Sequence, residues 1–136
     1  PIYELNIIDN SIKSLGIDFK LNQINGFKKN ILEGDIIKHL KKLPNSSFDF
    51  VTCTHVIEHL PYPEKTLLEL KRVCKNTLII ISPIEKKFKW GMNYHINFFA
   101  TKESFLDFCM NKKYKNNNLR KFDCYYRLGD MMYVEY

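Results

Sequence analysis

Two runs of apolar residues between positions 48 and 81 form the strongest pattern in the chain. Residues 48–53 are apolar except for Asp49 and Thr52, and residues 78–81 read Leu-Ile-Ile-Ile without a break. Strands covered on both faces, as in a parallel sheet, have such runs, whereas half-exposed antiparallel strands alternate polar and apolar residues. The pattern therefore predicts two buried, parallel strands.

The residues between the two runs predict a helix. Pro63 suits the first turn of a helix, where its missing N–H costs no hydrogen bond, and Glu64 is favourable near the positive end of the helix dipole. Apolar side chains then recur at helical spacing, at Leu67, Leu70, Val73 and Cys74. A strand, a helix and a strand form a βαβ unit, and strand twist makes its crossover right-handed.

The pattern before this unit is shorter and weaker. Residues 16–19 are expected to form a strand that closes on the carboxylate of Asp18. Residues 27–32 fit either a strand or a short helix. A small amphipathic helix before Pro44 is expected to bury Ile36, Ile37, Leu40 and Leu43.

After the central unit, residues 84–92 show no periodicity and are expected to form a loop at the sheet edge, where ligands are usually bound. Thr101 is a good N-cap for a helix that runs to about Asn111. The inner face of this helix is expected to carry Phe105, Leu106 and Cys109.

The end of the chain predicts a β-hairpin. Residues 121–128 and 131–136 are strand-like, and the intervening Gly129-Asp130 is typical of a tight turn. The two strands are therefore expected to pair antiparallel, unlike the two strands of the central unit.

Length and composition limit the class of protein. The chain has 136 residues, enough for one domain, residues 1–136, but not for two. No run approaches the roughly 20 apolar residues that cross a bilayer, and no signal-peptide pattern opens the sequence. The cysteines lie far apart without a C-x-x-C pair, which favours reduced thiols over a metal knuckle or a disulfide framework; they are Cys53, Cys74, Cys109 and Cys124. We expect a cytoplasmic protein.

The net charge of +6 raises the question of a phosphate-bearing partner. The cations are 18 Lys and 3 Arg, spread along the chain. Proteins that read nucleic acids usually use Arg, whose guanidinium donates two parallel hydrogen bonds. A nucleic-acid partner is therefore not expected.

Several segments together resemble the class I S-adenosylmethionine-dependent methyltransferases. The first, beginning at Gly34, reads G-D-x-x-x-x-L-x-x-L-P-N-S-S-F-D-F-V-x-x-x-H-V-I-E-H-L, and P-E-K-T-L-L-E-L-K-R-V-C-K and L-I-I-I-S-P follow it. The segment H-I-N-F-F-A-T-K-E-S-F, beginning at His95, is similar to one that follows the fifth strand in many small-molecule members. The resemblance covers roughly residues 16–110.

The resemblance implies a fold and a cofactor. The expected fold is α/β and Rossmann-like, with a mostly parallel sheet and an antiparallel C-terminal hairpin. S-adenosylmethionine is expected to lie across the carboxyl ends of the strands, and the methyl acceptor is expected to be a small molecule, a lipid or a sugar.

By position in the family pattern, Asp18 takes the ribose hydroxyls of the cofactor, because a carboxylate accepts from two adjacent hydroxyls. Asp9 is the alternative for this role. The resemblance likewise implies that Asp35 lies beside the adenine amine and that Ile36 packs on the adenine ring. Residues at the end of the fourth strand face the methionine part of the cofactor, namely Cys53, Thr54 and His55.

One feature of the family is missing from the sequence. The first strand of these enzymes ends in a glycine-rich G-x-G-x-G turn that lets the backbone approach the cofactor, and none of the five glycines makes such a turn. Either the chain is truncated and begins after that strand, or it is a degenerate relative that does not bind the cofactor. Losing a central strand exposes sheet edges, which a second copy or a partner chain would cover.

The polar residues after the first apolar run suggest two kinds of chemistry. His55-x-x-Glu58-His59 fits the H-x-x-E-H zinc signature. That site needs a continuous helix, but Pro61 and Pro63 follow at once and no third ligand is evident, so no metal is expected. Glu58 and His59 are interpreted either as structural or as an acid, base or orienting group beside the substrate.

His95 is a third catalytic candidate because it follows the loop expected to face the ligand, although a histidine beside two phenylalanines is often only packed. Two functions remain open. One is methyl transfer from S-adenosylmethionine, and the alternative is a non-catalytic interaction module with the same fold.

Overall fold

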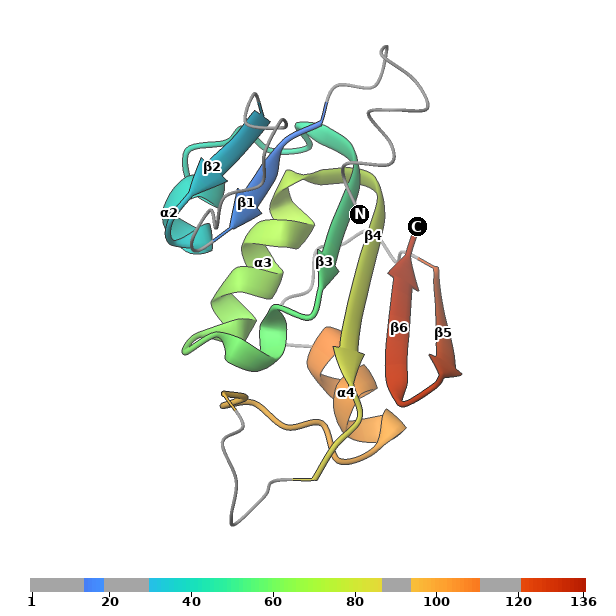
Figure 1. Ribbon diagram of the computed structural model, residues 1–136. Coiled ribbons are helices and arrows are strands. Elements are labelled where there is room, and N and C mark those ends of the chain that lie inside the picture. The colour runs from blue at the N-terminus through green and yellow to red at the C-terminus, as the bar shows by residue number, and fades with distance from the viewer. Residues whose placement is uncertain (1–13, 19–29, 87–93, 111–120) are drawn as a thin grey trace. The chain divides into compact units, whose positions relative to one another are not determined.

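The computed structural model describes residues 14–18, 30–86, 94–110 and 121–136 (Figure 1). They fall into two compact units that divide between Leu43 and Pro44. Among the described residues, no helix is long and apolar enough to cross a membrane.

The N-terminal unit contains a two-stranded parallel sheet. Strand β1 (Gly16–Asp18) pairs with β2 (Ile31–Glu33). The strand predicted at residues 16–19 is confirmed over its described part. Of the ambiguous segment 27–32, Ile31 and Leu32 lie in β2, so the strand alternative holds for these two residues. The pairing is parallel, as the resemblance implies for this half of the fold.

A glycine turn connects β2 to helix α2 (Ile36–Leu40). Gly34 has a φ of 125°, a conformation that side chains with a Cβ rarely adopt. Its N–H donates to the carbonyl of Asp18 (2.8 Å), which ties the turn to the end of β1. The short helix predicted before Pro44 is therefore confirmed.

The C-terminal unit contains a four-stranded sheet in the order β3-β4-β6-β5. Its strands are β3 (Phe48–Thr54), β4 (Cys74–Pro83), β5 (Phe122–Arg127) and β6 (Asp130–Glu135). Its helical elements are η2 (Ile57–His59), α3 (Pro63–Val73) and α4 (Lys102–Cys109). β3 and β4 run parallel, whereas β6 is antiparallel to both β4 and β5. The predicted βαβ unit, the terminal hairpin and the mixed α/β class are confirmed. The hairpin loop is Leu128-Gly129, however, and the predicted turn residue Asp130 is the first residue of β6.

Helix α4 begins where the sequence predicts. The Thr101 hydroxyl accepts from the Ser104 N–H (3.2 Å), and the Ser104 hydroxyl accepts from the Thr101 N–H (3.1 Å). This reciprocal capping box satisfies two N–H groups that no helical carbonyl reaches. Phe105 and Cys109 are buried on the inner face, as expected, and Leu106 is half-buried.

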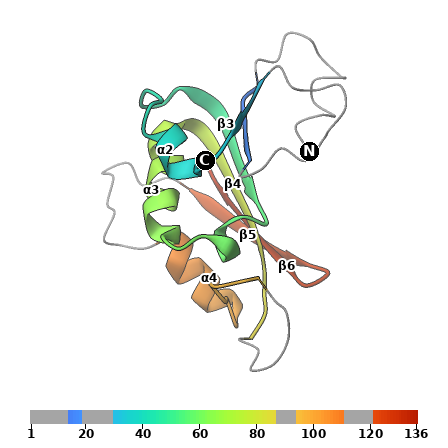
Figure 2. The same cartoon turned by 60° about the vertical axis from the view of Figure 1, so that its left-hand side comes forward.

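Helices α3 and α4 lie on the same face of the four-stranded sheet (Figure 2). The core fills the space between these helices and the sheet. Its buried apolar side chains include Leu67, Leu70, Val73, Leu78, Ile80, Phe105, Cys109, Met131 and Tyr133.

The sequence predicted that β3 and β4 would be buried on both faces. Among the described residues this prediction is wrong, because side chains on one face of these strands are half-buried or exposed. In β4, Leu78 and Ile80 are fully buried, but Ile79 and Ile81 are only half-buried. In β3, Phe50 is 70% exposed. Alternate side chains of a strand point to opposite faces, and α3 and α4 cover only one of them. The apolar runs therefore identify the strands but not the number of covered faces.

Candidate functional site

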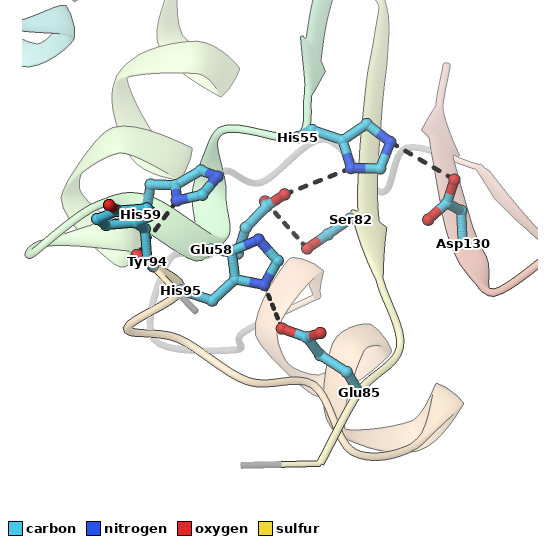
Figure 3. Close-up of polar contacts among 8 residues, drawn as sticks. All are labelled: His55, Glu58, His59, Ser82, Glu85, Tyr94, His95 and Asp130. Atoms are coloured by element: carbon cyan, nitrogen blue, oxygen red, sulfur yellow. Dashed lines mark hydrogen bonds and ion pairs between the residues drawn. The ribbon is translucent and has the colours of Figure 1, made fainter. Parts of the chain in front are cut away.

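Polar side chains gather where β3 and β4 end (Figure 3). His55 directly follows β3, and its N–H donates to the carbonyl of Ile81 in β4 (2.9 Å). The short helix η2 then carries Glu58 and His59. Ser82 is the last residue but one of β4. Because parallel strands end at one edge of a sheet, these side chains come together at the place where open α/β sheets bind ligands.

Glu58 is the buried centre of this group, with a side chain that is only 1% exposed. Its Oε2 accepts a hydrogen bond from the Ser82 hydroxyl (3.2 Å). Its Oε1 lies 3.4 Å from His55 Nδ1 but accepts no hydrogen bond. Leaving a buried acceptor unsatisfied costs about 1–3 kcal/mol. Such unsatisfied groups in folded proteins often have a catalytic or ion-binding role.

His55 adopts an unusual backbone conformation between two carboxylates. Its φ of 51° lies in the left-handed region, which costs a residue with a Cβ about 1–2 kcal/mol. Its Nε2 lies 3.5 Å from a carboxylate oxygen of Asp130, at the start of β6. Strained residues of this kind cluster at functional sites.

The segment after residue 93 is fastened to η2 by backbone hydrogen bonds. The N–H groups of Ile96 and Asn97 both donate to the carbonyl of Glu58 (2.8 and 3.0 Å). The Asn97 side-chain amide donates to the carbonyls of Ile57 and Leu60 (2.9 and 2.6 Å). These bonds fix the position of His95, the residue immediately before Ile96.

His95 consequently lies beside His59. Their ring centroids are 4.6 Å apart and their planes are nearly perpendicular. His59 Nδ1 donates to the carbonyl of Tyr94 (3.3 Å). His95 Nδ1 forms a hydrogen bond and ion pair with the carboxylate of Glu85, as Figure 3 shows.

Cys53 is a neutral thiol beneath this group. Burial, together with the smaller effect of the negative charge of Glu58, raises the pKa of Cys53 to about 12. A thiol with such a pKa is a poor nucleophile at neutral pH, because the thiolate is the reactive form. Cys53 therefore packs under the site and does not react there.

The family model described as "Methyltransferase domain" matches residues 3–81 of the chain, which is more than half of its length. The chain belongs to the methyltransferase domain family. The resemblance to class I S-adenosylmethionine-dependent methyltransferases is confirmed, and the match includes most of the sequence pattern but not the segment that begins at His95.

Solved structures of methyltransferases share the fold. A SAM-dependent methyltransferase from Archaeoglobus fulgidus has a TM-score of 0.71 and 18% identity, over 98% of this chain and 80% of that one. A SAM-dependent methyltransferase from Aquifex aeolicus has a TM-score of 0.51 and 21% identity, over 79% of this chain and 55% of that one. A SAM-dependent methyltransferase from Thermotoga maritima, described as a possible histamine N-methyltransferase, has a TM-score of 0.56 and 17% identity, over 77% of this chain and 62% of that one. No curated protein sequence matches the methyltransferase-family chain significantly.

The residues predicted to hold the cofactor belong to both units. In the N-terminal unit, Asp18 ends β1 with an exposed side chain, and Asp35 caps α2 by accepting from the N–H groups of Ile37 (2.8 Å) and Lys38 (3.2 Å). Asp35 therefore has a structural role, whatever it binds. Ile36 is half-buried at the start of α2. Asp9 lies outside the described residues.

In the C-terminal unit, Thr54 is the exposed last residue of β3 and His55 follows it, so both lie at the strand end where the resemblance puts them. The catalytic candidates Glu58, His59 and His95 form one cluster. Their roles stay predictions, as do those of the cofactor residues.

Three members of the site are missing from the sequence-based prediction. Glu85, Ser82 and Asp130 contact His95, Glu58 and His55 respectively. Each of these contacts joins different elements of the fold, and the sequence carries no signal for them. Ser82 follows an apolar run near a strand end, where ligand-facing residues often lie, but its position does not indicate its contact with Glu58.

Proposed function

We infer that this protein catalyses methyl transfer from S-adenosylmethionine to a small-molecule, lipid or sugar acceptor. The observation that carries the proposal is that the family model matches β3, α3 and most of β4, and that a buried carboxylate and two histidines converge at the carboxyl edge of these strands. Ligands of open α/β sheets bind at this edge. Family membership and the position of the polar cluster thus support the same function.

The cofactor supplies a methyl group on a positively charged sulfur, which departs as a neutral thioether. The protein needs mainly to hold the acceptor atom in line with the methyl group, because alignment provides much of the rate enhancement in such transfers. A base is needed only when the acceptor atom arrives protonated.

His95 is the residue that we assign as this base. Its Nδ1 donates to Glu85, so that Nε2 carries the lone pair that accepts a proton. A carboxylate that orients an imidazole in this way also stabilises the imidazolium that forms. His59 and Glu58 line the same space and would orient the acceptor.

Two aspartates of the N-terminal unit suit the cofactor. The exposed carboxylate of Asp18 can accept from two adjacent ribose hydroxyls. Asp35 is also exposed, and its carboxylate can accept from an exocyclic amine with the oxygen that does not cap α2. Ile36 offers an apolar side chain for a flat ring.

Calorimetric titration of the protein with S-adenosylmethionine, and separately with its demethylated product, tests cofactor use directly. We expect saturable binding of both compounds. Absence of heat at millimolar ligand would contradict cofactor use by this chain. With binding established, His95→Gln separates the catalytic role, because it should lower the methyl-transfer rate while leaving cofactor affinity unchanged.

A non-catalytic interaction module is the second candidate function, and the open edge of β3 favours it. Among the described strands, β3 pairs only with β4, and an unpaired strand edge is a surface for another chain. Calorimetry distinguishes the two functions, since an interaction module needs no cofactor. Two expectations from the sequence stay predictions: that the protein does not bind nucleic acid, and that it is cytoplasmic.

A further inference from the structure

Glu58, His59 and His95 each bring one potential metal-ligand atom to a common place, and these three atoms lie within 4.8 Å of one another. All three residues belong to the C-terminal unit. Glu58 and His59 are neighbours in η2, whereas His95 comes from the segment that Asn97 fastens to that helix. The sequence shows no third ligand beside Glu58 and His59, because His95 is far from them along the chain.

The hydrogen bonds of both histidines leave the same ring nitrogen as an electron-pair donor. His59 Nδ1 faces the Tyr94 carbonyl, which can only accept, so Nδ1 carries the hydrogen. His95 Nδ1 faces the Glu85 carboxylate and donates to it. Both imidazoles therefore carry the lone pair on Nε2. Histidine ligands in metalloproteins usually donate their other N–H to a carboxylate or a backbone carbonyl, as these two do.

The buried carboxylate gives a second, independent indication of a cation. Glu58 is 1% exposed, and its Oε1 accepts no hydrogen bond although Oε2 is bound by Ser82. Figure 3 shows the Glu58 side chain directed into the space between His55 and His95. A bound cation would satisfy this oxygen, which the surrounding hydrogen-bond donors do not.

We propose that Glu58, His59 and His95 bind one divalent transition-metal ion of the zinc or iron(II) class. Two imidazole nitrogens and one carboxylate oxygen are the ligands that such ions accept, whereas Mg²⁺ and Ca²⁺ prefer oxygen ligands alone. Ligand atoms about 2.1 Å from a shared ion lie about 3.4 Å apart in a tetrahedral site, so small side-chain rotations would close this one. Three protein ligands leave a coordination position open.

This site differs from the zinc signature in the sequence. In the H-x-x-E-H pattern, His55 and His59 would be ligands and Glu58 a base. Here Glu58 is a ligand and His55 lies outside the set, because its two nitrogens face Glu58 and Asp130. The helix that the signature needs is also missing, since η2 comprises only Ile57–His59.

Glu85 would act as a positioning residue. Its hydrogen bond to His95 Nδ1 sets the ring orientation and increases the basicity of Nε2. If the proposed methyl transfer holds, the bound ion takes over the role of the base, because His95 then donates its Nε2 lone pair to the metal. The open coordination position would take an acceptor hydroxyl and ease the loss of its proton. Metal binding itself does not depend on that function.

The test is a titration of the chelator-stripped full chain with Zn²⁺ against a chromogenic chelator, together with visible absorption spectra after Co²⁺ addition. We expect one ion per chain and a Co²⁺ spectrum without thiolate charge-transfer bands. Glu58→Gln, His59→Gln and His95→Gln should each weaken Zn²⁺ binding by at least tenfold. Failure to bind one equivalent, or thiolate bands from the cysteines, would overturn the proposal.

Two further variants separate this site from the alternative ligand set. His55→Gln and, in the N-terminal unit, His39→Gln should leave Zn²⁺ affinity within about threefold, as expected for residues that are not ligands. Glu85→Gln should weaken it roughly 10-fold to 100-fold. A loss of affinity in His55→Gln with none in His95→Gln would contradict the proposed set. Circular dichroism of each metal-free variant shows that the fold is retained, and none of these readouts requires methyl-transfer activity.

Discussion

The Asp35 carboxylate has one observed role and one proposed role. It caps helix α2 in the structure, and the family resemblance implies that it binds the cofactor. Its Oδ1 accepts from two backbone N–H groups at the start of α2, and the family pattern assigns the same side chain to the adenine amine. A single substitution to alanine would remove both contributions at once. Asparagine separates them, because it caps helices about as well as aspartate but carries no charge.

We predict that Asp35→Ala lowers the free energy of unfolding by about 1 kcal/mol, and that Asp35→Asn leaves it nearly unchanged. Both variants should bind S-adenosylmethionine about tenfold more weakly, because a hydrogen bond to a charged acceptor is stronger than one to a neutral acceptor. Chemical denaturation measures the first effect and calorimetry the second. Full affinity in Asp35→Asn would show that this carboxylate is only a helix cap.

Cys53 makes the free energy of unfolding fall as the pH rises through the alkaline range. Burial, reinforced by the nearby Glu58 charge, raises the pKa of Cys53 from 9.0 to about 12. The folded chain therefore keeps a proton that the unfolded chain releases. The resulting stability is complete below pH 9 and is lost as the pH rises toward 12, by about 1.4 kcal/mol per pH unit.

Between about pH 9 and pH 11, we predict that the free energy of unfolding falls less steeply in Cys53→Ala than in the wild type. The two slopes should differ by about 1.4 kcal/mol per pH unit. Urea denaturation at several pH values measures both slopes. Cys124→Ala is a suitable control, because Cys124 is only partly buried. Equal slopes for wild type and Cys53→Ala would contradict the raised pKa.

At the scale of single elements, the β5–β6 hairpin has an unusual turn. Arg127 pairs with Asp130, so Leu128 and Gly129 form a two-residue loop. Both residues have positive φ, 52° and 93°, as a type I′ turn requires. Glycine adopts this conformation readily, but leucine does not, and the Leu128 side chain is 92% exposed. Asn-Gly is the preferred sequence for this turn.

We predict that Leu128→Asn raises the free energy of unfolding by about 0.5–1 kcal/mol, because asparagine tolerates the left-handed conformation better. Leu128→Val should have the opposite sign, since a β-branched residue is strained at positive φ. Thermal and urea denaturation of the three proteins measures the order of stability. An unchanged or lower stability of Leu128→Asn would contradict the assigned turn.

Elements with contiguous signals were predictable from the sequence. Pro63 marks the start of α3, Thr101 caps α4, and the apolar run at residues 78–81 lies in β4. These signals are local, so no knowledge of packing is needed. The double-sided burial of β3 was wrong, because what covers a strand depends on elements elsewhere in the fold.

The site was predictable as a set of candidates but not as a geometry. Glu58, His59 and His95 were all candidates, because histidine and carboxylate residues near strand ends are chemically suited to a site. The pairing of His95 with Glu85 was not, since it depends on how the chain returns to the sheet after residue 93. Likewise, the left-handed conformation of His55 has no signal in residue type.

At the scale of the whole molecule, the outer edge of β3 is a surface through which two copies of the chain could associate. β3 pairs with β4 on one side, and no described strand pairs with its other side. Phe50 presents a large apolar side chain on this strand and is 70% exposed. Natural proteins protect strand edges with lysine or by covering them, and β3 contains no lysine. An exposed aromatic residue on a strand that has no described neighbour on one side favours association with a second copy.

We predict that the chain self-associates reversibly and that Phe50→Lys weakens the association by at least about tenfold, because an apolar anchor is lost and a charge is placed on the edge. Sedimentation equilibrium over a range of protein concentrations measures the association constant. Leu128→Lys adds the same charge at an exposed turn away from β3 and should associate like the wild type. Equal weakening in both variants would assign the effect to the higher net charge, and a monomer at every concentration would contradict association through β3.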